Sequence, residues 1–151
     1  MMPIFEQIDK DLVGAMKAKE ELRLSVIRMM KAALKLKQVE LGKPPDDAAA
    51  VAVLRTLVKQ HRESVEQFRK GGREDLAAKE EAEIKVVEAY LPSALPEAEI
   101  EAAVAAAIAE TGAAGPKDLG KVMKAAMAKL AGKNADGKRV SEMARKKLGS
   151  N

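Results

Sequence analysis

The sequence predicts an all-α fold for this chain of 151 residues, and three observations support that prediction. Hydrophobic residues make up 47% of the chain but aromatic residues only 2%, so Ala, Leu, Val, Ile and Met must form the core, a composition that favours helices. Between breaks rich in Gly and Pro, apolar residues recur at the spacing of a buried helix face. No run of alternating β-branched residues predicts a strand.

Two amphipathic helices are expected at the start of the chain. The first covers residues 4–18, and its apolar stripe consists of Ile4, Ile8, Leu12 and Met16. The second covers residues 21–41, and its apolar stripe consists of Leu22, Val26, Met29, Ala33 and Leu36.

A second pair of helices follows the break at residues 42–45. Asp46 or Asp47 can cap a helix that ends at Gly71. The apolar stripe of this third helix consists of Val51, Leu54, Val58, Val65 and Phe68. The fourth helix is expected from about Glu74 to Tyr90 and is closed by Pro92. Its inward residues are Leu76, Ile84, Val87 and Leu91.

The segment LPSALP, residues 91–96, predicts a linker, because two prolines so close together cannot continue a helix. We therefore expect an N-terminal bundle of four helices in domain 1–93 and a three-helix domain in 94–151. The three helices are predicted at about 97–111, 118–130 and 138–148.

Basic residues are concentrated near the C-terminal end. The whole chain has 27 basic and 23 acidic residues, a net charge of +4. Residues 116–149 alone contain ten basic and three acidic residues. This asymmetry favours an anionic partner, and the alternative is a basic surface that only keeps the protein in solution.

Helical geometry places most of these cations opposite the apolar faces, where they are candidates for binding RNA phosphates. The candidate RNA-binding residues are Lys117, Lys121, Lys124, Lys133, Lys138, Arg139, Arg145 and Lys146. Single-stranded RNA is disfavoured, since base stacking needs aromatic side chains and the chain has two Phe, one Tyr and no Trp. Spaced lysines on rigid helices suit the backbone of a folded, double-helical RNA.

A second basic run on the helix at 21–41 consists of Arg28, Lys31 and Lys35. It could extend the same RNA-binding surface. Alternatively, its cations could form surface ion pairs with acids of the fourth helix, namely Glu80, Glu81 and Glu83. We favour the ion pairs.

No arrangement of residues predicts a catalytic centre. The absence of Cys excludes thiolate chemistry, and His61 is the only imidazole. His61 projects onto the apolar arc of its helix, so we expect it to be buried. A helical di-iron site requires a Glu three residues before the His, and none stands there. Because Glu80, Glu81 and Glu83 are close together in sequence, we expect them to splay around their helix rather than converge. Residues 132–138 match the spacing of a P-loop, but Arg139 replaces its Ser or Thr. We expect no metal, no cofactor and no enzymatic activity of the chain alone.

The sequence also contains no apolar run long enough to span a membrane. Acidic residues interrupt the N-terminus before the apolar block of a secretory signal could form. A cytoplasmic location and no membrane partner are therefore expected.

Seven short segments of the chain carry a resemblance to a known family. These are RLSVIRMMKAAL at 23–34, ELGK at 40–43, HRESVEQF at 61–68, EEAEI at 80–84, YLP at 90–92, KDLGKVM at 117–123 and ADGK at 135–138. Together and in this order they resemble the YqeY family of the GatB/YqeY proteins, over nearly the whole chain.

The resemblance implies a function for the C-terminal half, which is similar to the tail domain of the GatB subunit of tRNA-dependent amidotransferase. That domain is a tRNA-contacting appendage, and the family label is carbon–nitrogen ligase with glutamine as amido-N-donor. Within the C-terminal half, the best matches are Lys117, Gly120, Lys121 and Lys124. Two departures from the pattern are an additional residue, Asn134, and Ser141 in place of Asn.

Three functions follow as alternatives. The first is a non-catalytic protein that binds tRNA or another structured RNA and presents it to an amidotransferase or an aminoacyl-tRNA synthetase. The second is an accessory component of a glutamine-dependent amidotransferase. The third is a helical adaptor that recruits a protein.

Overall fold

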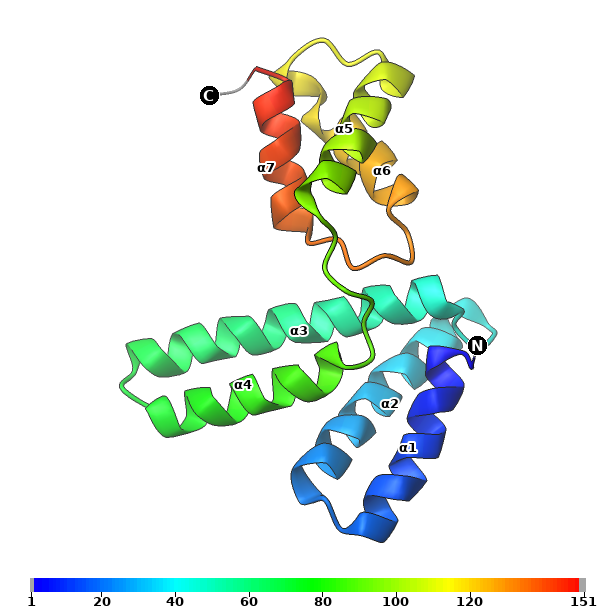
Figure 1. Ribbon diagram of the computed structural model, residues 1–151, viewed down its shortest axis with the longest axis vertical. Helices are drawn as coiled ribbons and strands as arrows, with labels where there is room; N and C mark the ends of the chain where they lie inside the picture. Colours follow the sequence, from blue (N-terminus) through cyan, green and yellow to red (C-terminus); the bar gives the residue numbers. More distant parts are fainter. Residues whose placement is uncertain (1, 150–151) are drawn as a thin grey trace. The chain divides into compact units, whose positions relative to one another are not determined.

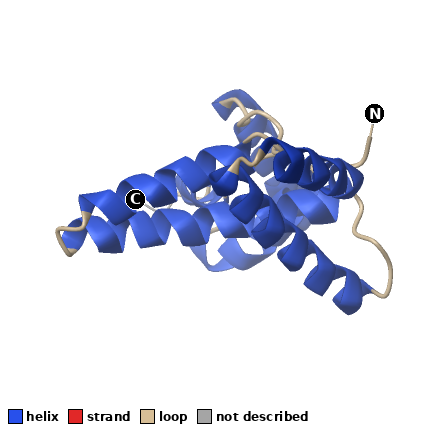
Figure 2. Ribbon diagram, turned by 90° about the horizontal axis from the view of Figure 1, so that it is seen from below, coloured by secondary structure: helices blue, strands red, loops and turns tan. Residues whose placement is uncertain are grey.

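The computed structural model describes residues 2–149 and confirms the all-α class. Figure 2 shows helices joined by loops, with no strand in the described range. Residue contacts divide the chain into two compact units, Met1–Pro92 and Ser93–Asn151. The division into a domain 1–93 and a domain 94–151 stays a prediction. None of the helices described is both long and apolar enough to cross a bilayer.

The N-terminal unit is built from two helical hairpins (Figure 1). Its helices are α1 (Ile4–Ala18), α2 (Glu21–Leu41), α3 (Asp47–Lys70) and α4 (Glu74–Glu88). Helix α1 packs on α2, α3 packs on α4, and α2 joins the hairpins by contacting both α3 and α4. Asp46 caps α3 by accepting a hydrogen bond of 2.8 Å from the Ala49 amide. Asp47 accepts another, of 2.9 Å, from the Ile4 amide at the start of α1.

The buried face of α2 differs from the predicted stripe. The buried side chains are Val26, Ile27, Met30 and Leu34. Leu22 and Leu36 are exposed instead, as is Met16 on α1. The sequence of α2 has apolar residues on more than one side, so its periodicity alone allows several stripes. Packing against α1, α3 and α4 selects one of them.

The C-terminal unit is a small three-helix assembly. It contains α5 (Glu97–Thr111), a 3₁₀ turn η1 (Pro116–Asp118), α6 (Leu119–Lys129) and α7 (Gly137–Lys147). Each of the three α-helices packs against the other two. Its fully buried side chains include Ile100, Val104, Val122, Ala126, Val140 and Ala144. Helices α6 and α7 therefore each bury an apolar face, as expected of amphipathic helices.

The segment that precedes α5 is bonded to the α6–α7 turn and to the first turn of α7. Ala94 and Asn134 form an isolated parallel bridge, in which the Leu95 amide donates to the Asn134 carbonyl at 3.4 Å. The carbonyl of Leu95 accepts a hydrogen bond of 2.9 Å from Arg139 Nη1. Arg139 and the additional residue Asn134 therefore tie the α6–α7 turn to the start of α5.

The aromatic side chains lie in the N-terminal unit. Phe5, Phe68 and Tyr90 all pack against its core. The Tyr90 hydroxyl donates to Asp11 Oδ2 on α1, so the residue just after α4 is tied to the first helix. Burial of the phenol, and next its bond to the Asp11 carboxylate, raise the pKa of Tyr90 from the ordinary 10.0 to about 12.

The high pKa of Tyr90 gives a stability test at alkaline pH. Because the folded-state pKa lies above the unfolded-state value, the contribution of the neutral phenol is complete below about pH 10. It is lost as the pH rises toward about 12. We expect the tyrosinate absorbance of this single Tyr to titrate near pH 12, and Asp11→Asn to lower that midpoint. A midpoint near pH 10 in the folded wild-type protein would contradict the contact.

Arg139 gives a stability test of the C-terminal unit. We expect Arg139→Met to reduce the free energy of unfolding by about 1–2 kcal/mol, because the Leu95 carbonyl loses a charged donor while the apolar stem is kept. Chemical denaturation followed by far-ultraviolet circular dichroism measures the change. The matched control is Lys138→Met, since Lys138 is the exposed neighbour. Equal stability of the two variants would show that the Arg139 contact contributes nothing.

Candidate functional site

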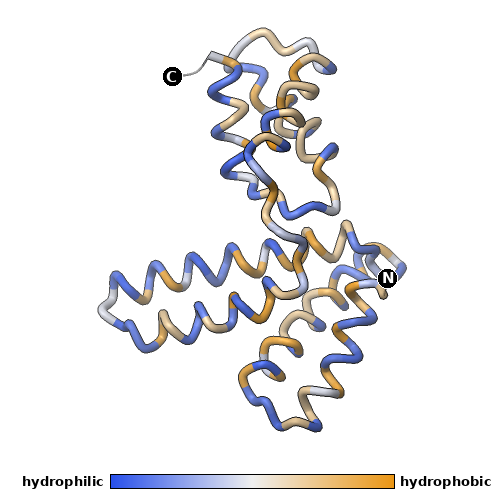
Figure 3. The backbone as a smooth tube through the Cα atoms, viewed as in Figure 1, coloured by the Kyte–Doolittle hydropathy of each residue, from blue (hydrophilic) through white to orange (hydrophobic). Residues whose placement is uncertain are grey.

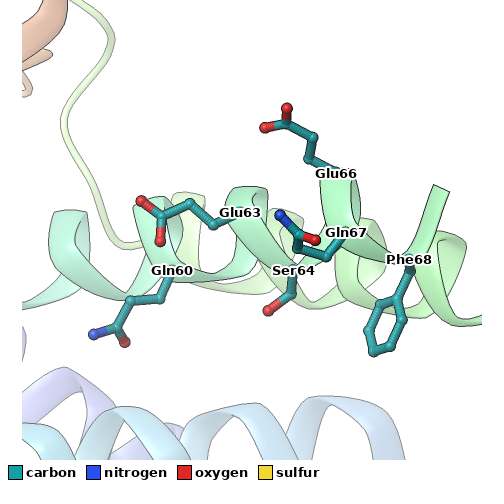
Figure 4. A pocket seen from close by; sticks show the side chains of 6 residues that line it. All are labelled: Gln60, Glu63, Ser64, Glu66, Gln67 and Phe68. Atoms are coloured by element: carbon teal, nitrogen blue, oxygen red, sulfur yellow. The ribbon is translucent and has the colours of Figure 1, made fainter. Parts of the chain in front are cut away.

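A surface depression on α3 does not resemble a catalytic site. It is lined by Gln60, Glu63, Ser64, Glu66, Gln67 and Phe68, all of them on α3. Figure 4 shows Gln60, Ser64 and Phe68 pointing to one side of the helix while Glu66 points to the other. Because one helix supplies every lining residue and their polar groups diverge, this depression does not form a convergent acid–base or nucleophilic site.

The segment with P-loop spacing is a turn between helices. Helix α6 precedes it, whereas a P-loop follows a strand. Gly132 has a φ of 80°, in the left-handed region, and Asp136 caps α7 by accepting from the Lys138 amide at 3.0 Å. The segment therefore joins two helices, as the expected helices at about 118–130 and 138–148 imply.

Helix α5 pairs with cations on its side of the C-terminal unit. Glu110 lies 2.6 Å from the Lys129 ammonium of α6, and Glu101 lies 3.2 Å from that of Lys147 on α7. Glu99 lies 3.7 Å from Lys133 Nζ in the turn. Lys133, a predicted RNA-binding residue, is thus placed beside an acid of α5.

Lys124, Lys138 and Arg145 lie on the sides of their helices opposite the cations that pair with α5. Lys124 lies about 140° around α6 from the α5-paired Lys129, and Arg145 about 160° around α7 from Lys147. Lys138 lies about 180° from Lys147. All three are exposed, and Figure 3 shows hydrophilic residues along α7 and in the turn before it. The exposed cations of η1, α6 and α7 that do not pair with an acid of α5 define the α6–α7 basic face, which consists of Lys117, Lys121, Lys124, Lys138, Arg145 and Lys146.

Ion pairing leaves this face largely available. Within residues 2–149, five of its six members have no ion pair with an acid: Lys117, Lys124, Lys138, Arg145 and Lys146. Lys121 Nζ is 3.9 Å from Asp118, whose pKa is lowered mainly by a hydrogen bond from the Ala114 amide. Glu142 is the exposed acid of α7, so the face keeps a positive balance.

Arg139 is placed differently from its prediction. It was expected to point outward with the other cations of α7, but it is half-buried and donates to the Leu95 carbonyl. On the helical circle it lies between the outer side and the α5 side of α7, within reach of the carbonyl before α5. Arg139 therefore holds the fold of the unit and is left out of the α6–α7 basic face.

Gly120 lies in the first turn of α6, between Lys117 of η1 and Lys121. An added Cβ there would meet nothing within 4 Å, and its φ is not in the left-handed region. Neither crowding nor backbone conformation requires a Gly at this exposed position, although Gly in a helix costs about 0.5–1 kcal/mol relative to Ala. A missing side chain does allow another molecule to approach the helix closely. A count of charged residues does not single out Gly120 as a candidate binding residue, but its position beside Lys121 and Lys124 does.

The second basic run does not pair with the acids of α4 as expected. Lys31 lies 2.8 Å from Asp9 on α1. Among the acids of α4, Glu81 pairs with Arg69. The predicted partners are wrong because α1, the neighbour of α2 in its hairpin, supplies the nearest acid.

Glu80 and Glu83 do not splay apart as expected. Both carboxylates face the Nε2 atom of His61, at 3.5 and 3.0 Å. Residues three apart share one flank of a helix, so Glu81 is the only one of the three acids that points elsewhere. The predicted burial of His61 on α3 is confirmed, since only 8% of the residue is exposed.

Comparison with curated proteins finds relatives in yeasts and related fungi. The chain is 39% identical over 90 residues to "Altered inheritance of mitochondria protein 41, mitochondrial" of Eremothecium gossypii, covering 59% of this chain and 49% of the relative. The protein of the same name from Lachancea thermotolerans is 38% identical over 85 residues, covering 56% and 46%. The chain thus spans about half the length of the curated relatives it matches.

The predicted cytoplasmic location is contradicted by these relatives, which are mitochondrial by name. The prediction rested on the lack of an apolar secretory block. Such a block is not a feature of mitochondrial transit peptides, which are amphipathic and rich in Arg. The lack of this apolar block therefore argues against a secretory signal only, and not against a mitochondrial location.

The family comparison covers nearly the whole chain. The model of the family described as Yqey-like protein matches residues 5–148, which include both units and every helix except the first residue of α1. The resemblance seen in the seven short segments is confirmed by this match. The chain belongs to the YqeY-like protein family.

Proposed function

We propose that the α6–α7 basic face binds the sugar–phosphate backbone of a structured RNA. The observation that carries this proposal is the separation of charges within the C-terminal unit. Lys129, Lys133 and Lys147 are neutralised by Glu99, Glu101 and Glu110 of α5, whereas the members of the α6–α7 basic face have no partner on α5. Exposed cations without protein partners are suited to displacing counterions from phosphates.

The chemistry of the face favours phosphate contacts over base readout. Its members are lysines and one arginine, on helices held rigid by the buried side chains of the unit. None of the three aromatic residues of the chain lies in this unit, so stacking on unpaired bases has no platform. A double-helical region recognised by shape fits these groups best.

Gly120 adds a specific place for close approach. Because Gly120 has no side chain, the backbone of the first turn of α6 can come nearer to a sugar or phosphate than it could at a position with a side chain. The resemblance to the GatB tail makes tRNA the RNA to test first, and it makes presentation of tRNA to an amidotransferase or synthetase the proposed biological role.

The two other functions make different demands. An accessory amidotransferase component would copurify with the catalytic subunits. A protein adaptor would form a complex that survives ribonuclease. The adaptor alternative is favoured by one observation, the 73% and 82% exposure of Leu36 and Val39 on α2. The α6–α7 basic face has no part in that alternative.

The RNA proposal predicts a strong dependence of tRNA binding on salt. If four or five phosphates are neutralised, the plot of log affinity against log salt concentration should have a slope of about −3 to −4. In the double variant Lys121→Gln/Lys124→Gln, removal of two contacts should weaken binding and flatten the slope by about 1.4–1.8. Fluorescence anisotropy of labelled tRNA over a salt series measures both quantities.

The matched control is the double variant Lys129→Gln/Lys147→Gln. It removes the same charge from the same two-helix region, but from side chains paired with α5. We expect its slope to stay near that of the wild type. If both double variants changed the slope equally, net charge rather than the α6–α7 basic face would account for binding.

Gly120→Ala separates RNA binding from stability. The added methyl group meets no atom of the protein and improves helix propensity, so the unfolding free energy should rise by a few tenths of a kcal/mol up to about 1 kcal/mol. Affinity for tRNA should fall, because the methyl group occupies the space left for the RNA backbone. Thermal denaturation and anisotropy report the two effects. Unchanged tRNA affinity in a stabilised variant would remove Gly120 from the interface.

A further inference from the structure

Three potential metal ligands meet between α3 and α4, within the N-terminal unit. They are His61, Glu80 and Glu83, and one ligand atom from each lies within 4.8 Å of the other two. His61 Nε2 is 3.0 Å from Glu83 Oε2 and 3.5 Å from Glu80 Oε2. Antiparallel packing of two long helices brings these side chains together.

The backbone determines which nitrogen of His61 carries a proton. Nδ1 lies 2.9 Å from the carbonyl oxygen of Leu57, one turn earlier on α3. A carbonyl can only accept, so Nδ1 must be the protonated nitrogen that donates this bond. In the neutral ring, Nε2 therefore directs a lone pair at two carboxylates. A cation has to lie between these three atoms.

A proton meets this need only in part. On Nε2 it makes one hydrogen bond, to the Glu83 oxygen at 3.0 Å, while the Glu80 oxygen at 3.5 Å forms no hydrogen bond with the ring. Neither carboxylate pairs with a Lys or Arg in the part of the chain that the structure describes. An imidazolium would leave one negative charge of this half-buried pair unbalanced, whereas a divalent ion balances both.

The distances from His61 Nε2 to the two carboxylates are close to those between ligands of one metal ion. With zinc–ligand distances of about 2.0–2.2 Å, neighbouring ligands of a tetrahedral ion are about 3.3–3.6 Å apart. The distances from His61 Nε2 to the two carboxylate oxygens, 3.0 and 3.5 Å, lie close to that range. A metal-bound His also donates its other ring N–H to a carbonyl or carboxylate, as His61 does to Leu57.

We propose that His61 Nε2 and one carboxylate oxygen each from Glu80 and Glu83 bind a single divalent transition-metal ion. Nitrogen and carboxylate ligands suit ions of the zinc and cobalt type. The side chains of Glu80 and Glu83 keep 23% and 15% of their surface exposed, so an ion and its remaining water ligands can enter from solvent. Coordination would link α3 to α4 at mid-hairpin.

The single His makes the test unambiguous. The full chain is titrated with Zn²⁺ while the ring nitrogens of His61 are followed by long-range ¹H–¹⁵N NMR. We expect a saturable change at one equivalent, with Nε2 shifted as a metal ligand and Nδ1 still protonated. Titration with Co²⁺ should give d–d absorption that appears over the same range. A titration without a saturable change at His61 would overturn the proposal.

Variants of α4 provide matched controls. Loss of a hydrogen-bond partner of a metal ligand lowers metal affinity by about 10- to 100-fold. Glu80→Gln and Glu83→Gln each remove a direct ligand, so each should lower the affinity for Zn²⁺ by at least that factor. Glu81→Gln removes the same charge between them but from a side chain that faces Arg69, and should bind Zn²⁺ as the wild type does. Far-ultraviolet circular dichroism checks that each variant is folded. Wild-type affinity in a folded Glu80→Gln/Glu83→Gln double variant would also overturn the proposal.

Discussion

The acidic side of α5 determines which cations of the C-terminal unit are available to a ligand. Glu99, Glu101 and Glu110 hold the ammonium groups of the turn, of α7 and of α6 within 4 Å. Each of these exposed ion pairs contributes little to stability, about 1 kcal/mol or less. Their larger effect is spatial, because they neutralise one side of the helices and leave the excess positive charge on the other. The α6–α7 basic face is a product of this separation.

Much of this arrangement could be predicted from the sequence, and the exceptions have physical causes. The buried faces of α6 and α7 follow from a single apolar arc, so their exposed cations follow as well. On α2 apolar residues occupy several sides, and only contact with neighbouring helices selects Ile27 and Met30 over Leu22 and Leu36. The partner of Arg139 is a backbone carbonyl 44 residues away, which no local pattern encodes.

The meeting of His61 with Glu80 and Glu83 shows a similar limit. Spacing within α4 puts the two acids on one flank, so half of the cluster could have been read from the sequence. Their distance to His61 depends on the register between α3 and α4. That register is set by the packing of the whole hairpin, including Leu54, Val58 and Ile84 in its core. Pairwise register between helices is a tertiary property.

The confinement of aromatic residues to one unit has a consequence for how the molecule is observed. Phe5, Phe68 and Tyr90 all belong to the N-terminal core, while the core of the C-terminal unit is aliphatic. Tyrosine emission and near-ultraviolet dichroism are therefore blind to residues 93–151, whereas peptide-bond dichroism records both units. Melting curves from the two kinds of signal will coincide only when the two units unfold together in one cooperative transition. Tyr90 therefore reports the unfolding of the N-terminal unit separately, without an added label.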